Sequence, residues 1–436
     1  MQKPCNFRWF STYSRQDHPT LFFFLVQANN VTSPRQIQRG LLYDIVVIGA
    51  GIVGTATAYK LKERRPDLRL CIIDKEEGPA RHQSGRNSGV IHSGIYYQPG
   101  SHKALNCQKG YEELLHFCDR NEVRYDICGK IIAAVNNEEA ARLSGILERG
   151  IANGLTGLRM LNREESLEIE PHVHCTASIF VPQTGIISYR GVAEKQLELA
   201  CNMGAQARFS TALTGLQRVG NETIIHTTGG DIRCKTAINC TGLYADTTAA
   251  MTGHGEGLKV LPFRGEFYDL VPERQYLVNN LIYPVPNPAF PFLGVHFTRM
   301  IEGGIEAGPN AVLAFRREGY SRWDVHVPEL FEMLAFSGLH RIAEKYWRIE
   351  LEELRRSFFK SAFVKALQRL IPEVRDEDLV RARSGVRAMA CQKDGQLVDD
   401  FLIRRSEGIV HVLNAPSPAA TASLSVGNWI ADVALG

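Results

Sequence analysis

The stretch that most constrains the fold of this chain runs from Tyr43 to Gly94. Within it, an apolar run from Ile45 to Ile48 leads directly into three glycines, Gly49, Gly51 and Gly54. This order predicts a strand, a glycine turn and a helix. Glycine at these three positions permits a tight turn, the approach of backbone to a pyrophosphate, and close packing of the helix on the strand. The helix start also offers unpaired N–H groups and the positive end of a dipole, which favour an anion.

A second apolar run, Leu68 to Ile73, ends at Asp74, which lies 20 residues beyond Gly54. An acidic side chain at that distance accepts hydrogen bonds from ribose hydroxyls, so the stretch predicts a complete βαβ unit that binds a dinucleotide. The cofactor contacts predicted here are Gly49, Gly51, Ile52, Gly54, Asp74 and Lys75. The motif alone does not distinguish NAD from FAD, and an ordinary βα turn with incidental glycines is the alternative.

Length and composition narrow the class of protein. A chain of 436 residues exceeds one ordinary core and suggests two domains. A net charge of +3 is too small to indicate a nucleic-acid partner. The ten cysteines form no CxxC pair and no Cys/His cluster at metal-ligand spacing, so we expect neither a metal site nor a disulfide framework, and a reducing compartment fits best.

Residues 1–42 precede the first predicted strand. Their longest apolar run, Leu21 to Val26, is far short of the roughly 20 residues that a membrane helix needs. The segment mixes arginines with serines and threonines and carries one acid, Asp17, a composition compatible with a weak mitochondrial transit peptide. The plainer interpretation is an unstructured tail or a start assigned too far upstream.

The rest of the chain alternates helical and strand patterns. We expect helices over Ser101–Asn121 and Glu138–Asn153, one strand over Tyr125–Val135, and a helix start capped by Asn162 with Glu165. Strand patterns also cover 205–216, 223–227 and 236–240; an antiparallel sheet follows over 261–315, then helices over 325–370 and a last helix near 421–434.

This order predicts an α/β fold, α+β overall, in which a Rossmann-like domain is assembled from separated segments around an inserted antiparallel-sheet domain. We expect residues 43–100, 185–260 and 380–436 in the cofactor-binding domain and residues 101–184 and 261–379 in the substrate-binding domain.

The loop from His82 to Gly94 favours FAD over NAD. It concentrates small and hydrogen-bonding residues, among them Ser84, Asn87, Ser88 and Gly89, directly after the predicted ribose-binding strand. Such a loop allows backbone to approach the pyrophosphate and the flavin ring while side chains satisfy their polar edges, which a nicotinamide-binding domain does not require.

At this point the chain resembles a known family. From Tyr43 to its end it is similar to the superfamily of FAD-dependent D-amino-acid oxidases and glycerol-3-phosphate dehydrogenases, and within it to the L-2-hydroxyglutarate dehydrogenase/oxidase family. The segments that carry the resemblance are HQSGRNSGVIHSGIYY (82–97), CGK (128–130), TGIISYR (184–190), PFRGE (262–266), IYPVP (282–286), PFLGVHFTRM (291–300), GPNAVLAFRREGY (308–320), GVRA (385–388) and NAPSPAAT (414–421).

The resemblance implies FAD as cofactor and oxidation of L-2-hydroxyglutarate to 2-oxoglutarate by hydride transfer to flavin N5. It implies that Gly242 is a second flavin-contacting glycine, and that the segment 415–420 lines the pyrimidine edge of the flavin through Ala415, Pro416, Ser417, Ala419 and Ala420. Alternatives are another activity of the superfamily, on an amino acid or glycerol 3-phosphate, and a non-catalytic FAD-binding redox protein.

A five-carbon hydroxy diacid carries two carboxylates, and each requires a cation, preferably arginine. Arg387 matches the superfamily position that binds the carboxylate beside the reacting carbon, with an ordinary salt bridge as the alternative. Arg264 is a candidate for the same pocket, Arg299 for the distal carboxylate, and Tyr283 for the pocket wall, against structural roles for all three.

Oxidation of the alcohol also requires a base for the hydroxyl proton, and histidine is the usual choice. His296 and His92 are the candidates, with a slight preference for His296. The family resemblance further implies that the reduced flavin passes electrons to a quinone or another acceptor. A membrane quinone would imply peripheral membrane association, so the expected location is cytoplasmic or peripheral on the inner membrane, or mitochondrial if the N-terminal tail is a transit peptide.

Overall fold

The carboxyl ends of four adjacent parallel strands organise the first half of the structure. In the computed structural model these are β2 (Leu70–Ile73), β1 (Leu42–Ile48), β12 (Ile232–Asn239) and β20 (Ile409–Asn414), which pair in that order. The structure describes residues 41–255, 257–287 and 294–436, so most of the N-terminal tail predicted for residues 1–42 and the start of the 291–300 segment lie outside the described residues. Leu42 already belongs to β1, one residue before the predicted boundary.

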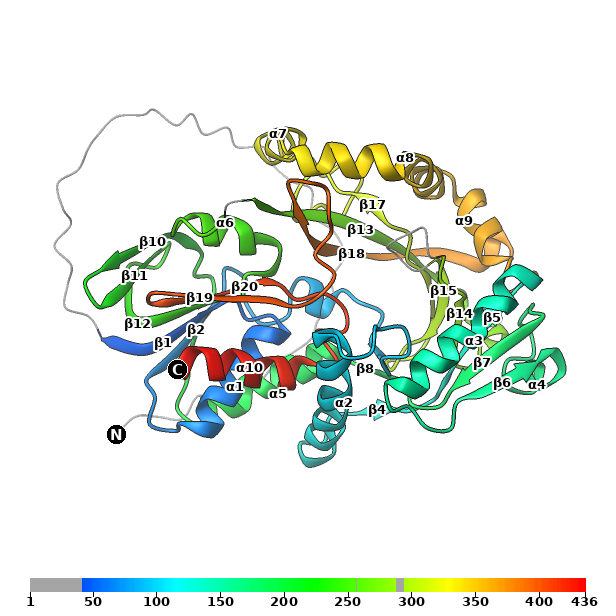
Figure 1. The fold of residues 1–436 in the computed structure, drawn as a ribbon, viewed down its shortest axis with the longest axis horizontal. Helices are drawn as coiled ribbons and strands as arrows, with labels where there is room; N and C mark the ends of the chain where they lie inside the picture. The colour runs from blue at the N-terminus through cyan, green and yellow to red at the C-terminus, as the bar shows by residue number, and fades with distance from the viewer. Residues whose placement is uncertain (1–40, 256, 288–293) are drawn as a thin grey trace. The chain divides into compact units, whose positions relative to one another are not determined.

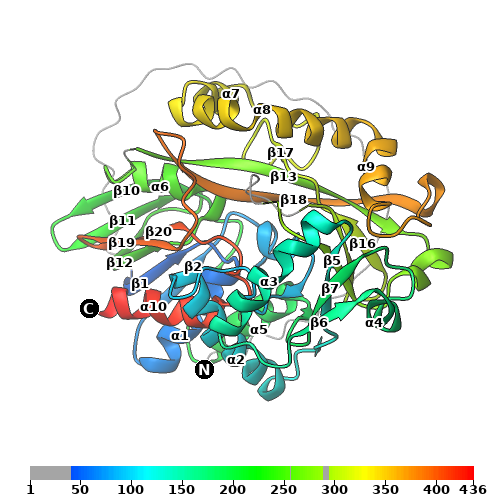
Figure 2. The ribbon, with the colours of Figure 1, turned by 45° about the vertical axis from the view of Figure 1, so that its right-hand side comes forward.

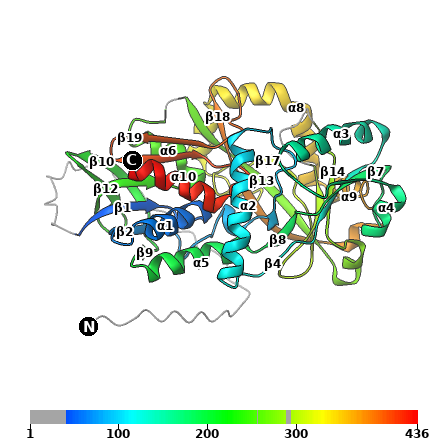
Figure 3. The same ribbon diagram turned by 60° about the horizontal axis from the view of Figure 1, so that its bottom comes forward.

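This first sheet has eight strands. Strand β9 (Gln206–Arg208) extends it in parallel beyond β2, while β10 (Leu213–Val219), β11 (Glu222–Thr227) and β19 (Leu402–Ser406) join antiparallel. Helices α5 (Tyr189–Asn202) and α10 (Ser423–Leu435) both pack against α1 (Ile52–Arg64) along one face of the sheet (Figure 3). The run of buried β-branched residues in β1 and β2 is typical of parallel strands that are covered on both faces.

The second sheet has nine strands and is mostly antiparallel. Its path runs β17 (Val312–Leu313), β13 (Leu258–Leu270), β16 (Ile305–Gly308), β15 (His296–Arg299), β14 (Leu281–Pro284), β5 (Lys130–Ala134), β7 (Ala177–Val181) and β6 (Arg159–Asn162), and β18 (Leu379–Gln392) pairs along β13. The antiparallel strands predicted over 261–315 are therefore present. The sheet also includes β5, β6, β7 and β18 from outside that range, and β14 and β5 pair in parallel.

Helices cover this sheet from two sides. Figures 1 and 2 show α7 (Val327–Leu334), α8 (Ser337–Phe358) and α9 (Lys360–Leu367) above β13 and β18, and α3 (Asn137–Ala152) and α4 (Arg163–Ile169) beside β5, β6 and β7. A small sheet of β3 (Val90–Ile91), β8 (Gly185–Ile187) and β4 (Tyr125–Asp126) also forms, and α2 (His102–Arg120) contacts α10. The short helix α6 (Ala245–Ala250) follows β12. No helix of the described ranges is both long and apolar enough to cross a bilayer.

The predicted helix cap is confirmed, whereas two predicted strands are each divided in the structure. Asn162 and Glu165 form the predicted reciprocal capping box at the start of α4. The single strand predicted over Tyr125–Val135 is wrong: Gly129, with a φ of +78°, separates β4 from β5, and the two strands belong to different sheets. The predicted strand over 205–216 likewise divides into β9 and β10. The predicted domain boundaries stay a prediction.

Candidate active site

The glycine turn after β1 has no room for side chains at two of its three positions. Gly49 has a φ of +107°, and a Cβ there would lie 2.4 Å from the Cys240 carbonyl oxygen. A Cβ on Gly54 would lie 1.9 Å from the Gly49 carbonyl oxygen, because α1 starts directly against the end of β1. The third glycine, Gly51, is the N-cap of α1, in an extended conformation. Both steric limits match the roles that the sequence assigns to the first and third glycines of a dinucleotide cradle.

Residues of the following strand and loop surround this helix start. Asp74, after β2, accepts hydrogen bonds from the Ala50 N–H at 2.7 Å and the Glu76 N–H at 2.9 Å, and burial raises the pKa of its carboxyl group. Ser84 Oγ accepts a hydrogen bond from the Ile52 N–H at 2.9 Å. The neighbouring Lys75 forms ion pairs with Glu76 and Glu318. The structure therefore brings Asp74 and Ser84 to the helix start and directs the Lys75 ammonium to two carboxylates.

The loop from His82 to Gly94 is held by its own side chains. The Asn87 amide donates to the carbonyls of Gln83 and Ser84, and its oxygen accepts from the Gly89 N–H. Gly89 has a φ of +67°, and a Cβ there would lie 2.5 Å from the Ile187 carbonyl oxygen. Asn87 thus fixes the conformation of the loop, and half-buried Ser88 lies between these two residues.

Two distant segments meet at the same edge of the sheet. Gly242 follows β12, has a φ of +57°, and lies beside Gln83 of the loop. The segment 415–420 follows β20, and its neighbour Thr421 accepts a hydrogen bond from the His92 N–H at 3.1 Å. The predicted cofactor residues therefore follow the carboxyl ends of β1, β2, β12 and β20, which is where open parallel sheets bind ligands. The cradle and this clustering fit a dinucleotide.

Three side chains of the second sheet lie on one face, next to one another. The register of β14 with β5 and β15 pairs Ile282 with Ile131 and Phe297, whose side chains pack in the hydrophobic core on one side. Because strand residues alternate between faces, Tyr283, Lys130 and His296 lie on the other side. The Tyr283 ring is 4.0 Å from the His296 ring, and Lys130 Nζ is 4.9 Å from the Tyr283 ring centroid.

This group is buried, and the positive charges of Lys130 and Arg387 act on its histidine. Burial lowers the pKa of His296 to about 3, with Arg387 and Lys130 contributing to the same shift. Burial also lowers the pKa of His92 to about 3, and the charges of Lys130 and His296 contribute to the same shift. Both imidazoles are therefore neutral at physiological pH. His296 Nδ1 lies 2.9 Å from the Gly294 carbonyl oxygen, which can only accept, so Nδ1 carries the proton and Nε2 is left as a proton acceptor.

Arg387, on β18, belongs to the same electrostatic group, since it contributes to the lowered pKa of both His92 and His296. The other two predicted arginines have counter-ions. Arg264 is 3% exposed, pairs through Nε with Glu266 at 3.2 Å and donates to the Ser321 carbonyl. Arg299 ends β15 and pairs through Nη2 with Asp126 at 2.5 Å. Within the described ranges neither forms a hydrogen bond with His296, Tyr283 or Lys130.

The sequence reasoning did not assign two residues that the structure places here. Lys130 is almost fully buried and lies on the same sheet face as the predicted base. Thr421 follows the 415–420 segment, and its hydroxyl oxygen accepts a hydrogen bond from the His92 backbone N–H. A signal for Lys130 was available, since it is a lysine at the start of an otherwise apolar strand, Lys130–Ala134. Buried lysines are rare unless they have a partner or a function.

Comparisons with known proteins agree with this arrangement. Residues 44–433 match the family described as FAD dependent oxidoreductase. The L-2-hydroxyglutarate dehydrogenase of Indibacter alkaliphilus is 48% identical over 394 residues, covering 90% of this chain and 99% of that protein. The human protein named L-2-hydroxyglutarate dehydrogenase, mitochondrial, is 40% identical over 407 residues, covering 89% and 88%. Among solved structures, the FAD-bound L-alpha-glycerophosphate oxidase of Mycoplasma pneumoniae superimposes with a TM-score of 0.75 at 20% identity, covering 91% of this chain and 96% of that one, which supports the fold.

Proposed function

The chain belongs to the FAD dependent oxidoreductase family, and from this premise we propose that it oxidises L-2-hydroxyglutarate to 2-oxoglutarate. The observation that carries the proposal is similarity over nearly the full length to proteins of that named activity, at 48% identity to a bacterial one and 40% to the human one. The buried positive group of Lys130 and Arg387 supports it, because a dicarboxylate is a dianion at neutral pH.

FAD fits the cradle at the carboxyl ends of the parallel strands. Gly49, Gly51 and Gly54 with the α1 N–H groups would hold the pyrophosphate, Asp74 the ribose, and the loop with the 415–420 segment the flavin end. Bound FAD supplies an acceptor for the hydride that leaves the α-carbon of the substrate.

The residues of this chain have separate roles in the proposed reaction. Arg387 binds the carboxylate beside the reacting carbon, as a planar cation suited to two parallel hydrogen bonds. His296 Nε2 accepts the hydroxyl proton, because the Gly294 carbonyl fixes its tautomer and Tyr283 holds its ring. His92 lies nearby with its N–H bonded to Thr421, and it is the alternative base.

Anaerobic titration of the purified flavoprotein tests the function. L-2-hydroxyglutarate should bleach the flavin absorbance, whereas D-2-hydroxyglutarate, amino acids and glycerol 3-phosphate should leave it unchanged. Bleaching by an amino acid or by glycerol 3-phosphate instead would assign the chain to another activity of its family. If no hydroxy acid bleaches the flavin, the chain would be a protein that binds FAD without catalysing the oxidation.

Single-turnover flavin reduction separates the two histidines. We expect His296→Gln to slow reduction about 10²–10⁴-fold, the range for loss of a positioned general base, and His92→Gln to have the smaller effect. The reverse ranking would make His92 the base. Matched FAD content and melting temperature in the two variants exclude misfolding as the cause.

We further propose that a membrane quinone accepts the electrons and that the outer side of α7 and α8 contacts the membrane. Large apolar side chains are exposed there at helical spacing, with Phe331 68% and Trp347 52% exposed. This α7–α8 face comprises Val327, Phe331, Leu334, Trp347, Leu351 and Phe358. The exposed charged residues of α8 include four cations, Arg341, Lys345, Arg348 and Arg355, and two acids, Glu344 and Glu352. Exposed apolar surface flanked by cations is typical of an interfacial helix.

Vesicle flotation tests the α7–α8 face. The wild-type protein should float with vesicles that contain anionic lipid, and Phe331→Ser with Trp347→Ser should abolish flotation while bleaching by substrate in solution is unchanged. Turnover with a water-soluble quinone analogue should persist in that variant, whereas turnover with quinone embedded in vesicles should fall. Equal flotation of both proteins would reject the face.

A further inference from the structure

Lys130 is a buried cation with no counter-ion. It is 2% exposed at the start of β5, and all five residues of that strand are buried. Within the described part of the chain its ammonium makes no hydrogen bond and no ion pair. Such a group is costly to desolvate, and a lysine is almost never fully buried unless it is paired. A lysine kept in such an unfavourable position indicates a function for its charge.

Two tyrosine rings flank the ammonium. Nζ lies 4.7 Å from the Tyr96 ring centroid and 4.9 Å from the Tyr283 ring centroid. Ring faces attract a cation but do not replace a carboxylate. Burial accordingly lowers the pKa of Lys130 to about 7, and no carboxylate of the described residues opposes that shift. The Tyr96 hydroxyl is likewise buried without a hydrogen-bond partner among the described residues. Lys130 therefore brings positive charge to this place, and no carboxylate among the described residues pairs with it.

The position of Lys130 relative to the proposed base matches the length of the substrate. In the strand order β15, β14, β5, the ring of Tyr283 lies between His296 and Lys130. Adjacent strands are about 4.8 Å apart, so β15 and β5 are separated by about 10 Å. The two carboxyl carbons of a five-carbon diacid are joined by four carbon–carbon bonds of about 1.5 Å each. With the hydroxyl at His296, the chain can extend across Tyr283 until its far carboxylate reaches Lys130.

The arginines considered for that far carboxylate are already neutralised. Arg299 pairs with Asp126 and Arg264 with Glu266. Arg387 belongs to β18, and the strand order β18, β13, β16, β15, β14, β5 places it on the side of β15 and His296, away from β5. We propose that Lys130 binds the distal carboxylate of the substrate and thereby selects dicarboxylates. This inference rests on the proposed function, since it assigns the second charge of the same substrate.

The test compares substrates that differ only in the distal charge. Lys130→Met keeps an unbranched side chain that is shorter by one atom, and it removes the charge. We expect kcat/KM for L-2-hydroxyglutarate to fall about 30- to 3000-fold, the range for truncating one partner of a buried charge pair, and kcat/KM for its 5-amide to change less than about threefold. Lys130→Arg should retain most of the preference for the diacid. Lys195→Met, at an exposed pair with Glu198 on α5, is the matched control and should behave as wild type.

A binding measurement keeps the inference separate from turnover. Glutarate should perturb the flavin spectrum of the oxidised wild-type protein with an affinity at least about 30-fold higher than that for Lys130→Met, while butyrate should bind both proteins equally. If the wild-type protein does not oxidise L-2-hydroxyglutarate, the proposed function fails, but the glutarate comparison still tests Lys130. Equal loss for the diacid and the amide in Lys130→Met, with unchanged glutarate binding, would overturn the inference and indicate that Lys130 acts on the reacting hydroxyl. Retained preference in a variant with full FAD content would also overturn it.

Discussion

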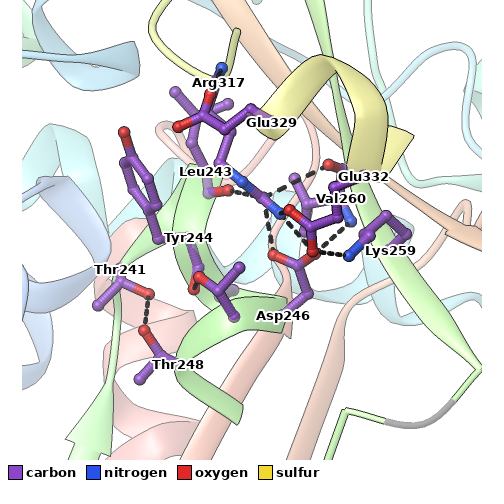
Figure 4. Close-up of polar contacts among 12 residues, drawn as sticks. Thr241, Leu243, Tyr244, Asp246, Thr248, Lys259, Val260, Arg317, Glu329 and Glu332 are labelled. Carbon is purple, nitrogen blue, oxygen red and sulfur yellow. Dashed lines mark hydrogen bonds and ion pairs between the residues drawn. The ribbon is translucent and has the colours of Figure 1, made fainter. Parts of the chain in front are cut away.

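The buried ion pair between Asp246 and Arg317 should be essential for holding the segment that follows β12. Both side chains are 3% exposed, and the guanidinium donates to the two carboxylate oxygens of Asp246 at 2.8 and 3.0 Å (Figure 4). Asp246 also accepts from the Val260 N–H at 3.1 Å, and Arg317 also donates to the Leu243 carbonyl. The pair therefore connects the first turn of α6, four residues after Gly242, to the start of β13 and to the segment before α7.

Asp246→Asn keeps the shape of the side chain and removes its charge, which leaves the Arg317 guanidinium buried without its principal counter-ion. The remaining carboxylate, Glu332, is 3.9 Å away and half-exposed. Breaking a buried pair in this way costs about 3–5 kcal/mol. For a folded unit of about 400 residues, an unfolding entropy of about 2.1 cal/mol/K per residue converts this cost to a fall in melting temperature of about 4–6 °C.

Thermal unfolding with saturating FAD measures the effect, and a double-variant cycle tests its cause. Because a buried ion pair can often be replaced by apolar residues without loss, Asp246→Leu combined with Arg317→Met should unfold closer to wild type than either single variant does. Asp231→Asn, at an exposed pair with His226, should change the melting temperature by less than about 1 °C. A fall below about 1 °C in Asp246→Asn, or a double variant whose loss equals the sum of the two, would refute the reasoning.

Three further changes have expected outcomes from the same structure. Arg387→Ala should raise KM and lower kcat/KM about 30- to 3000-fold in steady-state assays with L-2-hydroxyglutarate, and unchanged kinetics would remove Arg387 from the site. Gly54→Ala should lose bound FAD and about 1–3 kcal/mol of stability, because its Cβ would lie 1.9 Å from the Gly49 carbonyl oxygen. The absorbance of the purified protein measures the FAD content. Gly145→Ala, with open space around it in α3, is the control and should keep its FAD. Burial raises the pKa of Glu306 from 4.5 to about 7 in the folded protein. Between these two pH values the folded protein keeps the proton on Glu306 while the unfolded chain has released it, so the free energy of unfolding falls as the pH rises from about 4.5 to 7. Glu306→Gln should therefore lose less stability than wild type between pH 5 and 8 in urea unfolding, whereas exposed Glu302→Gln should follow wild type.

The cofactor cradle could be predicted from the sequence because its constraints are local. Gly49, Gly54 and Asp74 lie within one βαβ unit, and the steric conflicts that require glycine arise from β1, α1 and the end of β12. The capping box of Asn162 and Glu165 is likewise formed by residues three apart. The contact of Gly54 with Gly49 and the capping box each join residues within one standard unit, so spacing alone predicts their geometry. The contact of Gly49 with the Cys240 carbonyl oxygen is the exception, because it depends on the pairing of β1 with β12.

The charge environment of the substrate pocket could not be predicted in the same way. Arg299 is neutralised by Asp126, 173 residues away in the sequence, and the contact exists only because β4 and β15 end near each other. Lys130, Tyr283 and His296 share a face through the register of three strands, and a shift of one residue would turn each side chain to the opposite side. Residue type indicates which groups can bind a carboxylate, but only the strand pairing shows which of them lack a counter-ion.

The lack of a counter-ion for Lys130 also explains why the protein keeps a site that lowers its stability. Lys130, His92 and His296 are buried where desolvation opposes their charged forms, and no carboxylate of the described residues is among the groups that offset this cost. An apolar replacement at Lys130 should therefore stabilise the free protein, as removal of an uncompensated buried charge does elsewhere. A dianionic substrate supplies the missing negative charge, so the stability that the free protein gives up becomes selective binding of a ligand with two carboxylates. A site of this kind discriminates against monocarboxylates because they leave the Lys130 ammonium buried without a carboxylate.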